Sequence, residues 1–187
     1  MSQQTELKDR IRAYAREHPN AHLRSMADVL GIPEREIAAN IEGSVPVPVS
    51  DFFDIWEEAA AWESCLFFVD HGNVVVEAEG PLPRGTVMFD GTLLNLDDHT
   101  AGSESAHGEE AHHDTKLGGH IYPEDLQAIY LIRKQLYGKE SLSVMFYDSG
   151  KGSMFGLFAG RGADREILPS VRKRFDALWD KYTNAKA

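Results

Sequence analysis

Strand-like segments follow one another from residue 65 to residue 159 without an intervening helix, and this succession constrains the fold more than any other feature. The segments are rich in Val, Ile, Leu and Phe. They cover residues 65–69, 74–79, 86–89, 92–96, 128–136, 141–147 and 154–159. Tight turns such as Asp70-His71-Gly72-Asn73, Asp90-Gly91 and DSGKGS join neighbours, so these neighbours must run antiparallel. The sequence therefore predicts an antiparallel sheet built as a meander.

Amphipathic helices flank these strands. One is predicted from Asp51 to about Trp62, with Ser50 as its N-cap and its apolar residues on one stripe. The other covers the C-terminal segment, where five apolar residues recur at helical spacing between Leu168 and Tyr182. Because an apolar stripe must be covered and the sheet is the available apolar surface, we expect an α+β fold with helices packed on the sheet.

The first 43 residues form a separate trihelical unit in this interpretation. Short helices are predicted near residues 6–16, 23–30 and 34–41, and their tight turns resemble a helix-turn-helix. The extended segment GSVPVPVS follows and marks the boundary to a sheet domain at residues 44–187. Residues 1–43 carry six basic and seven acidic side chains, which argues against a DNA-reading unit. A packing or dimer-supporting role is therefore expected.

Charge and hydropathy restrict the class of protein. The 187 residues include 30 Asp+Glu and 19 Lys+Arg, a formal charge of −11 at pH 7, so nucleic acids and anionic membranes are poor general partners. No apolar run approaches the roughly 18 residues of a membrane span, and the polar N-terminus does not resemble a secretory signal. The single cysteine, Cys65, excludes an internal disulfide. These features predict a cytoplasmic protein.

Five of the eight histidines lie between His99 and His120. Most fall in an insert at residues 97–115, interleaved with carboxylates, a composition that suits weak binding of a divalent metal such as zinc. The insert also lacks apolar anchors, so a solvated flexible loop is the alternative interpretation. His120 differs, because Gly118 and Gly119 before it leave room for a bulky ligand. It is predicted either to ligate a metal or to be a hydrogen-bonded structural residue.

No enzyme motif accompanies these histidines. The sequence has no nucleophile elbow, phosphate-binding loop or dinucleotide fingerprint. Cys65 lies in an apolar run and is interpreted as a buried small hydrophobe, while His71 reads as a turn residue. A binding protein without catalytic activity is therefore the expectation.

Several separated elements resemble the ChuX/HutX family of cytosolic haem-utilisation proteins. They are FFDIWEEAAAW, VVVEAEGPLPRG, LLNL, LGGHI and SVMFYDSGKGSMFGLFAGRGADREILP, and the resemblance extends over about residues 45–182. It implies an intracellular carrier or buffer of haem, of the b type, used in haem uptake and iron utilisation. It also implies a homodimer and delivery to a downstream haem-degrading protein.

The resemblance carries over to particular residues of this chain. His120 occupies the histidine of the family's GGH element, so it is the expected haem-contacting residue and iron ligand. Asp70 stands where some members have a second haem-associated histidine, and His71 directly after it is the substitute carried here. The family's phenol in YFNL is replaced by Leu93, which cannot bind iron. A propionate partner is expected in Lys116 or Arg84.

Two other functions remain open from the sequence. Related sheet domains occur in proteins with haem-degrading or haem-reducing activity, so an enzyme is one alternative. The other is a regulator that pairs the trihelical unit with a ligand-sensing domain. Haem carriage is the leading prediction.

Overall fold

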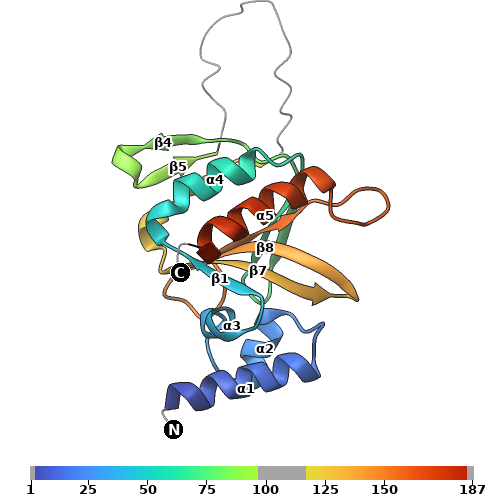
Figure 1. Cartoon of the computed structure of the whole chain (residues 1–187). Helices are drawn as coiled ribbons and strands as arrows, with labels where there is room; N and C mark the ends of the chain where they lie inside the picture. The colour runs from blue at the N-terminus through green and yellow to red at the C-terminus, as the bar shows by residue number, and fades with distance from the viewer. Residues whose placement is uncertain (1–2, 97–116, 185–187) are drawn as a thin grey trace, which may run out of the picture.

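Two antiparallel sheets carry the fold of this computed structural model, which describes residues 3–96 and 117–184 (Figure 1). The larger sheet has six strands, in the order β1 (Ser44–Val47), β7 (Ala128–Leu136), β8 (Lys139–Tyr147), β9 (Phe155–Ala159), β2 (Cys65–Asp70) and β3 (Val75–Gly80). The smaller sheet has three, β4 (Thr86–Met88), β5 (Leu93–Asn95) and β6 (His120–Ile121). The predicted α+β class and the antiparallel hairpins are confirmed. The single meander is wrong, because β4, β5 and β6 form a separate sheet and β2 pairs with β9.

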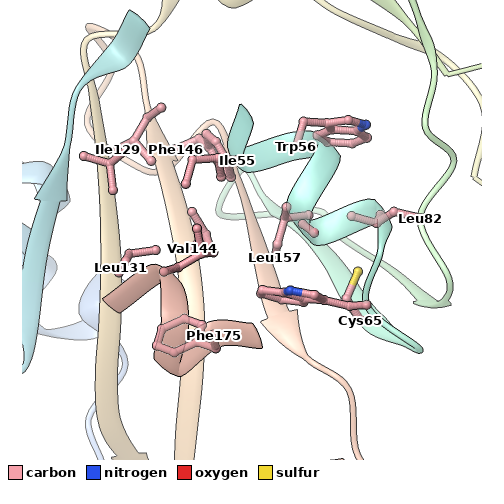
Figure 2. Close-up of a cluster of buried hydrophobic side chains, with 14 of the residues drawn as sticks. Ile55, Trp56, Cys65, Leu82, Ile129, Leu131, Val144, Phe146, Leu157 and Phe175 are labelled. Atoms are coloured by element: carbon pink, nitrogen blue, oxygen red, sulfur yellow. The ribbon is translucent and has the colours of Figure 1, made fainter. Parts of the chain in front are cut away.

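Helices α4 (Phe52–Ala60) and α5 (Pro169–Asn184) pack on one face of the larger sheet, as expected (Figure 1). Figure 2 shows Ile55 and Trp56 of α4 meeting Phe146 and Leu157 from the central strands. The indole N–H of Trp56 donates to the carbonyl oxygens that follow β3, at 3.0 and 3.1 Å, so burying the ring leaves no donor unsatisfied. This interface forms the main core.

The beginning of α4 differs from the prediction in its capping. A short 3-10 turn, Val49–Asp51, precedes the helix, and no side chain accepts from its first amides. The hydroxyl of Ser50 instead donates to the carboxylate of Asp51 at 3.0 Å. Ser50 as the N-cap is therefore wrong, because the 3-10 turn moves the helix start by one residue beyond it.

The N-terminal helices α1 (Gln3–Glu17), α2 (Leu23–Leu30) and α3 (Glu34–Asn40) pack on the other face of the sheet. Ile11, Met26 and Ile37 are buried there against residues of β7 and β8. Helix α3, the recognition helix of the predicted helix-turn-helix, has Ile37 and Ala38 buried, and Arg35 donates to the carbonyl of Asp148 at 3.1 Å. The buried face of α3 therefore packs against the sheet.

Residues after α3 join this unit to the sheet directly. The segment interpreted as an extended linker is extended, and Ser44–Val47 within it forms strand β1, paired along β7. Gly43 precedes this strand with a φ of +77°, and a Cβ there would meet the carbonyl oxygen of Arg133. The close approach of backbone to backbone therefore requires glycine at the junction.

The environment of Cys65 agrees with its interpretation as a buried small hydrophobe. The thiol of Cys65 is buried, and this burial raises its pKa to about 12, as suits a small core residue without thiolate chemistry. None of the helices in residues 3–96 and 117–184 is long and apolar enough to cross a bilayer.

Candidate functional site

A cavity of about 770 Å³ lies on the face of the larger sheet that carries the N-terminal helices. Strands β7, β8, β9, β2 and β3 form its floor, and residues at the start of α2 and α3 contribute to its wall. The volume is within the range of sites that enclose a ligand of drug or cofactor size. The cavity therefore depends on the N-terminal unit as well as on the sheet.

The register of the strands explains why the floor has an apolar centre. Ser143 of β8 faces Ile132 on one side and Phe158 on the other, and Phe158 in turn faces Leu66. Alternate residues of a strand point to the same face, so Met145 joins this set two positions further along β8. All five line the cavity. They provide a surface suited to a flat hydrophobic ligand.

Charged side chains lie at two sides of the cavity. Lys134, Lys139, Arg161 and Arg165 line it around the β7–β8 hairpin and the segment after β9. Arg161 is oriented by donating to the carbonyls of Glu140 and Arg165 at 2.6 and 2.9 Å, and Lys139 pairs with Glu166.

The opposite side, along β3, presents Glu77 and Glu79. The strand order separates β7 and β8 from β3, so Lys134 and Lys139 are held apart from these two glutamates. A ligand with anionic groups at one edge would therefore be oriented toward the β7–β8 hairpin.

His22 and Tyr137 provide two metal-ligating side chains in the lining of this cavity. Nε2 of His22, the residue preceding α2, is 2.8 Å from the hydroxyl of Tyr137 in the β7–β8 turn. Burial, and then the charge of Lys134, lower the pKa of His22, which favours the neutral imidazole. Sequence reasoning missed both residues, because they are 115 positions apart. The Tyr-Gly pair between two strands was the signal for the turn.

The loop between α1 and α2 is docked onto the same hairpin. Lys134 donates to the carbonyl oxygens of Pro19 and Ala21 at 3.2 and 2.7 Å, and the amide of Gly138 donates to the side chain of Asn20 at 2.9 Å. Burial lowers the pKa of Lys134 to about 8. These contacts hold His22 in place at the cavity wall.

Glu34 is a buried carboxyl where α3 meets the sheet beside the cavity. The hydroxyl of Tyr147 donates to it at 3.1 Å, and its own amide donates to the carbonyl of Lys151 at 2.8 Å. Burial raises the pKa of Glu34 to about 7, against smaller opposing effects of Tyr147 and Arg24. The carboxyl therefore titrates near neutral pH.

We expect this titration to appear in the stability of the protein. The folded-state pKa, about 7, lies above the ordinary value of 4.5, so Glu34 stabilises the fold below pH 4.5 and loses this contribution as pH rises through 7. Relative to Glu34→Gln, the free energy of unfolding of the wild type should fall by up to about 3 kcal/mol over that interval. Urea denaturation of both proteins at several pH values measures the difference. Parallel stability curves would contradict it.

The sequence-predicted ligands lie away from the cavity. His120 is exposed on β6 of the smaller sheet, where it pairs with Asn95, and His71 is exposed in the turn between β2 and β3. Neither lines the cavity, and the structure does not bring them together in one sheet. Asp70, next to His71, does line the cavity, whereas Leu93 is buried in β5.

The other sequence-predicted groups are placed as follows. Arg84 is exposed outside the cavity, and Lys116 lies outside the described residues. The His-rich insert at residues 97–115 is also outside them, so its predicted metal site is not described. Within residues 3–96 and 117–184, no group of three or more His, Cys, Asp or Glu side chains could hold a metal ion.

Comparison with known proteins gives a consistent result. Residues 45–178 match the family described as Haem utilisation ChuX/HutX. The intracellular heme transport protein HutX of Vibrio cholerae serotype O1 is 22% identical over 178 residues, which cover 94% of this chain and 84% of HutX. The crystal structure of ChuX has a TM-score of 0.75 at 23% identity, covering 95% of this chain and 98% of ChuX. A protein from Agrobacterium tumefaciens reaches 0.76 at 27%, covering 97% and 98%.

Proposed function

Because the chain belongs to the ChuX/HutX family of haem-utilisation proteins, we propose that it binds haem between α2 and the six-stranded sheet and carries it without chemical change. The observation that supports this placement most is the cavity of about 770 Å³ with its apolar floor. A haem needs a broad apolar slot, a Lewis base for the iron and cations for two propionates. All three are present among the cavity residues.

The placement orients the haem. The porphyrin lies against Phe68, Met145 and Phe158, which cover the middle of the floor. The propionates point toward Arg161, Lys139 and their neighbours near the β7–β8 hairpin, because Glu77 and Glu79 repel them from the opposite side. These cations replace Lys116 and Arg84, the partners expected from the sequence.

The iron ligand is proposed within the cavity, and His120 is the alternative. His120 and His71 are the ligands expected from the family resemblance, and both are exposed and thus free to meet a ligand on the surface. They lie outside the cavity, whereas His22 and Tyr137 line it. Substituting His120 by Ala distinguishes the two placements, since only surface binding at β6 requires that imidazole.

The haem type, its delivery and the assembly of the protein are proposed from membership of the ChuX/HutX family. The haem is of the b type, bound through contacts with the protein and released intact to a downstream haem-degrading protein. The carrier works in the cytoplasm, and the similarity to HutX, an intracellular heme transport protein, supports this location. A homodimer is its proposed assembly.

Two rival functions receive less support. Haem degradation would need an electron donor, and no fingerprint of a dinucleotide site is present in the sequence. Reductant added to the haem complex separates this enzyme from a carrier, because only turnover yields a linear tetrapyrrole. DNA binding by the N-terminal unit would need a free recognition helix, and α3 packs on the sheet.

Haemin titration tests the proposed function. We expect the Soret band to shift and to saturate at one haem per chain, and we expect His120→Ala to leave both the band and the affinity unchanged. The physical reason is that the apolar floor and the cations, all outside β6, provide the binding energy. Absorption that rises without saturation would contradict haem carriage. Loss of the band in His120→Ala would move the ligand to the smaller sheet.

A further inference from the structure

The hydrogen-bonded pair of Tyr137 and His22 is the part of the cavity best suited to binding iron. Both side chains line the cavity, and two of their potential ligand atoms, Nε2 of His22 and the phenol oxygen of Tyr137, lie 2.8 Å apart. Because Nε2 of the imidazole already contacts the phenol, only one of the two can approach a metal without the other moving away. The geometry therefore poses a choice between a nitrogen and an oxygen ligand.

The backbone of Tyr137 favours the oxygen. Tyr137 and Gly138 form the two-residue turn between β7 and β8, with φ of +52° and +75°. The first position of such a turn ordinarily holds Asn, Asp or Gly, since a residue with a large side chain is strained there. This strained turn position nevertheless holds a tyrosine, 83% exposed, at the cavity rim. Residues held in sparsely populated backbone conformations concentrate at functional sites.

The surroundings of His22 suit a residue that orients Tyr137 and does not itself bind the iron. The ring is partly buried, it packs edge-on against Tyr137 with ring centroids 5.3 Å apart, and the loop before it is fixed by Lys134 and Asn20. A fixed imidazole next to a phenol can accept its proton when the oxygen binds a metal.

We propose that Tyr137 is the ligand of ferric haem iron and that His22 is a positioning residue that accepts the hydrogen bond of the phenol; this inference rests on the proposed function. Binding forms one bond between the phenol oxygen and the iron. The proton of the hydroxyl passes to Nε2 of His22, and the solvent ligand of free haemin leaves as water. Iron remains ferric throughout, so no oxidant or reductant takes part. A phenolate is an established ligand of ferric haem.

Absorption and resonance Raman spectra of the haem complex test the assignment. The wild type should display phenolate-to-iron charge transfer and phenolate vibrations enhanced in that band. Tyr137→Phe removes only the oxygen, and it should eliminate these signals and weaken haem binding by about 10-fold or more. Retention of the signals in Tyr137→Phe would overturn the assignment, because the phenolate bound to iron would then belong to another tyrosine.

Substitutions of His22 test its supporting part. His22→Leu should weaken binding by about 10- to 100-fold, the usual effect of losing a partner that orients a metal ligand. His22→Gln keeps a hydrogen-bonding side chain without the base, and it should restore the phenolate signals in part. His71→Gln and His120→Gln are matched controls that should change neither spectrum nor affinity. Wild-type spectra in His22→Leu would overturn the positioning role.

The outcomes separate this inference from the proposed function. Haem that binds the wild type stoichiometrically without phenolate signals would refute Tyr137 as ligand and leave haem carriage intact. Failure of the wild type to bind haem at all would refute the proposed function. Circular dichroism of Tyr137→Phe and His22→Leu verifies that each variant is folded, so that loss of binding is not loss of structure.

Discussion

Ser143→Trp should abolish stoichiometric haem binding, lowering the affinity by about 100-fold or more. Ser143 lies in the middle of the cavity floor, between Ile132 and Phe158, and an indole at this position would occupy the space proposed for the porphyrin. Each tenfold loss of affinity corresponds to about 1.4 kcal/mol of binding free energy. A hundredfold loss of affinity therefore corresponds to twice this free energy. That is a small loss compared with the porphyrin contacts that the indole would block. Haemin titration measures it.

Two further variants make the result interpretable. Ser50→Trp places the same indole on the exposed surface before α4 and should bind haem as the wild type does. Leu66→Trp fills the cavity from the half-buried position on β2, and it serves if Ser143→Trp is unstable. Full affinity in a folded variant with a filled cavity would place haem elsewhere on the molecule.

Phe146→Ala should lower the free energy of unfolding by about 3–5 kcal/mol, because it removes a large side chain from a close-packed interior. Phe146 is fully buried on β8, where it stacks on Phe155 with ring centroids 4.3 Å apart and meets Phe52 edge-on at 5.8 Å. Urea denaturation gives the difference. A loss of this size is a large fraction of the stability of an ordinary domain.

The matched control for this variant is Phe89→Ala. Phe89 is 70% exposed beyond β4, so removing its ring should change the stability by less than about 1 kcal/mol. Equal effects of the two substitutions would contradict the burial of Phe146 beneath α4. The comparison holds the chemical change constant and varies only the environment.

The sequence predicted the bounds of several helices and strands better than it predicted how these elements pair and pack. Strand β7 and helix α2 have the predicted bounds, because alternation and helical periodicity are local signals. The sequence of strand β1 indicates only a linker, since four residues that include a proline give no strand signal until β7 pairs with them. The N-cap of α4 failed for a similar reason, as a 3-10 turn and a helix begin with the same residue types.

The candidate site was predictable only in part. The resemblance pointed to haem and to His120, a residue marked by the two glycines before it. The cavity could not be foreseen, because the N-terminal unit covers a sheet whose strands come from distant parts of the chain. His22 and Tyr137 become neighbours only when the β7–β8 turn docks on the loop before α2. Such pairings depend on tertiary structure.

The most direct test of the account is where the porphyrin ring lies. Zinc protoporphyrin is diamagnetic, and its ring current shifts the NMR signals of methyl groups that it contacts. We predict large shifts for the methyl groups of Met145 and Leu66 in the cavity floor, and none for Leu94 and Ile121 in the smaller sheet. Shifts confined to Leu94 and Ile121, with Met145 unaffected, would contradict haem binding beneath the N-terminal helices.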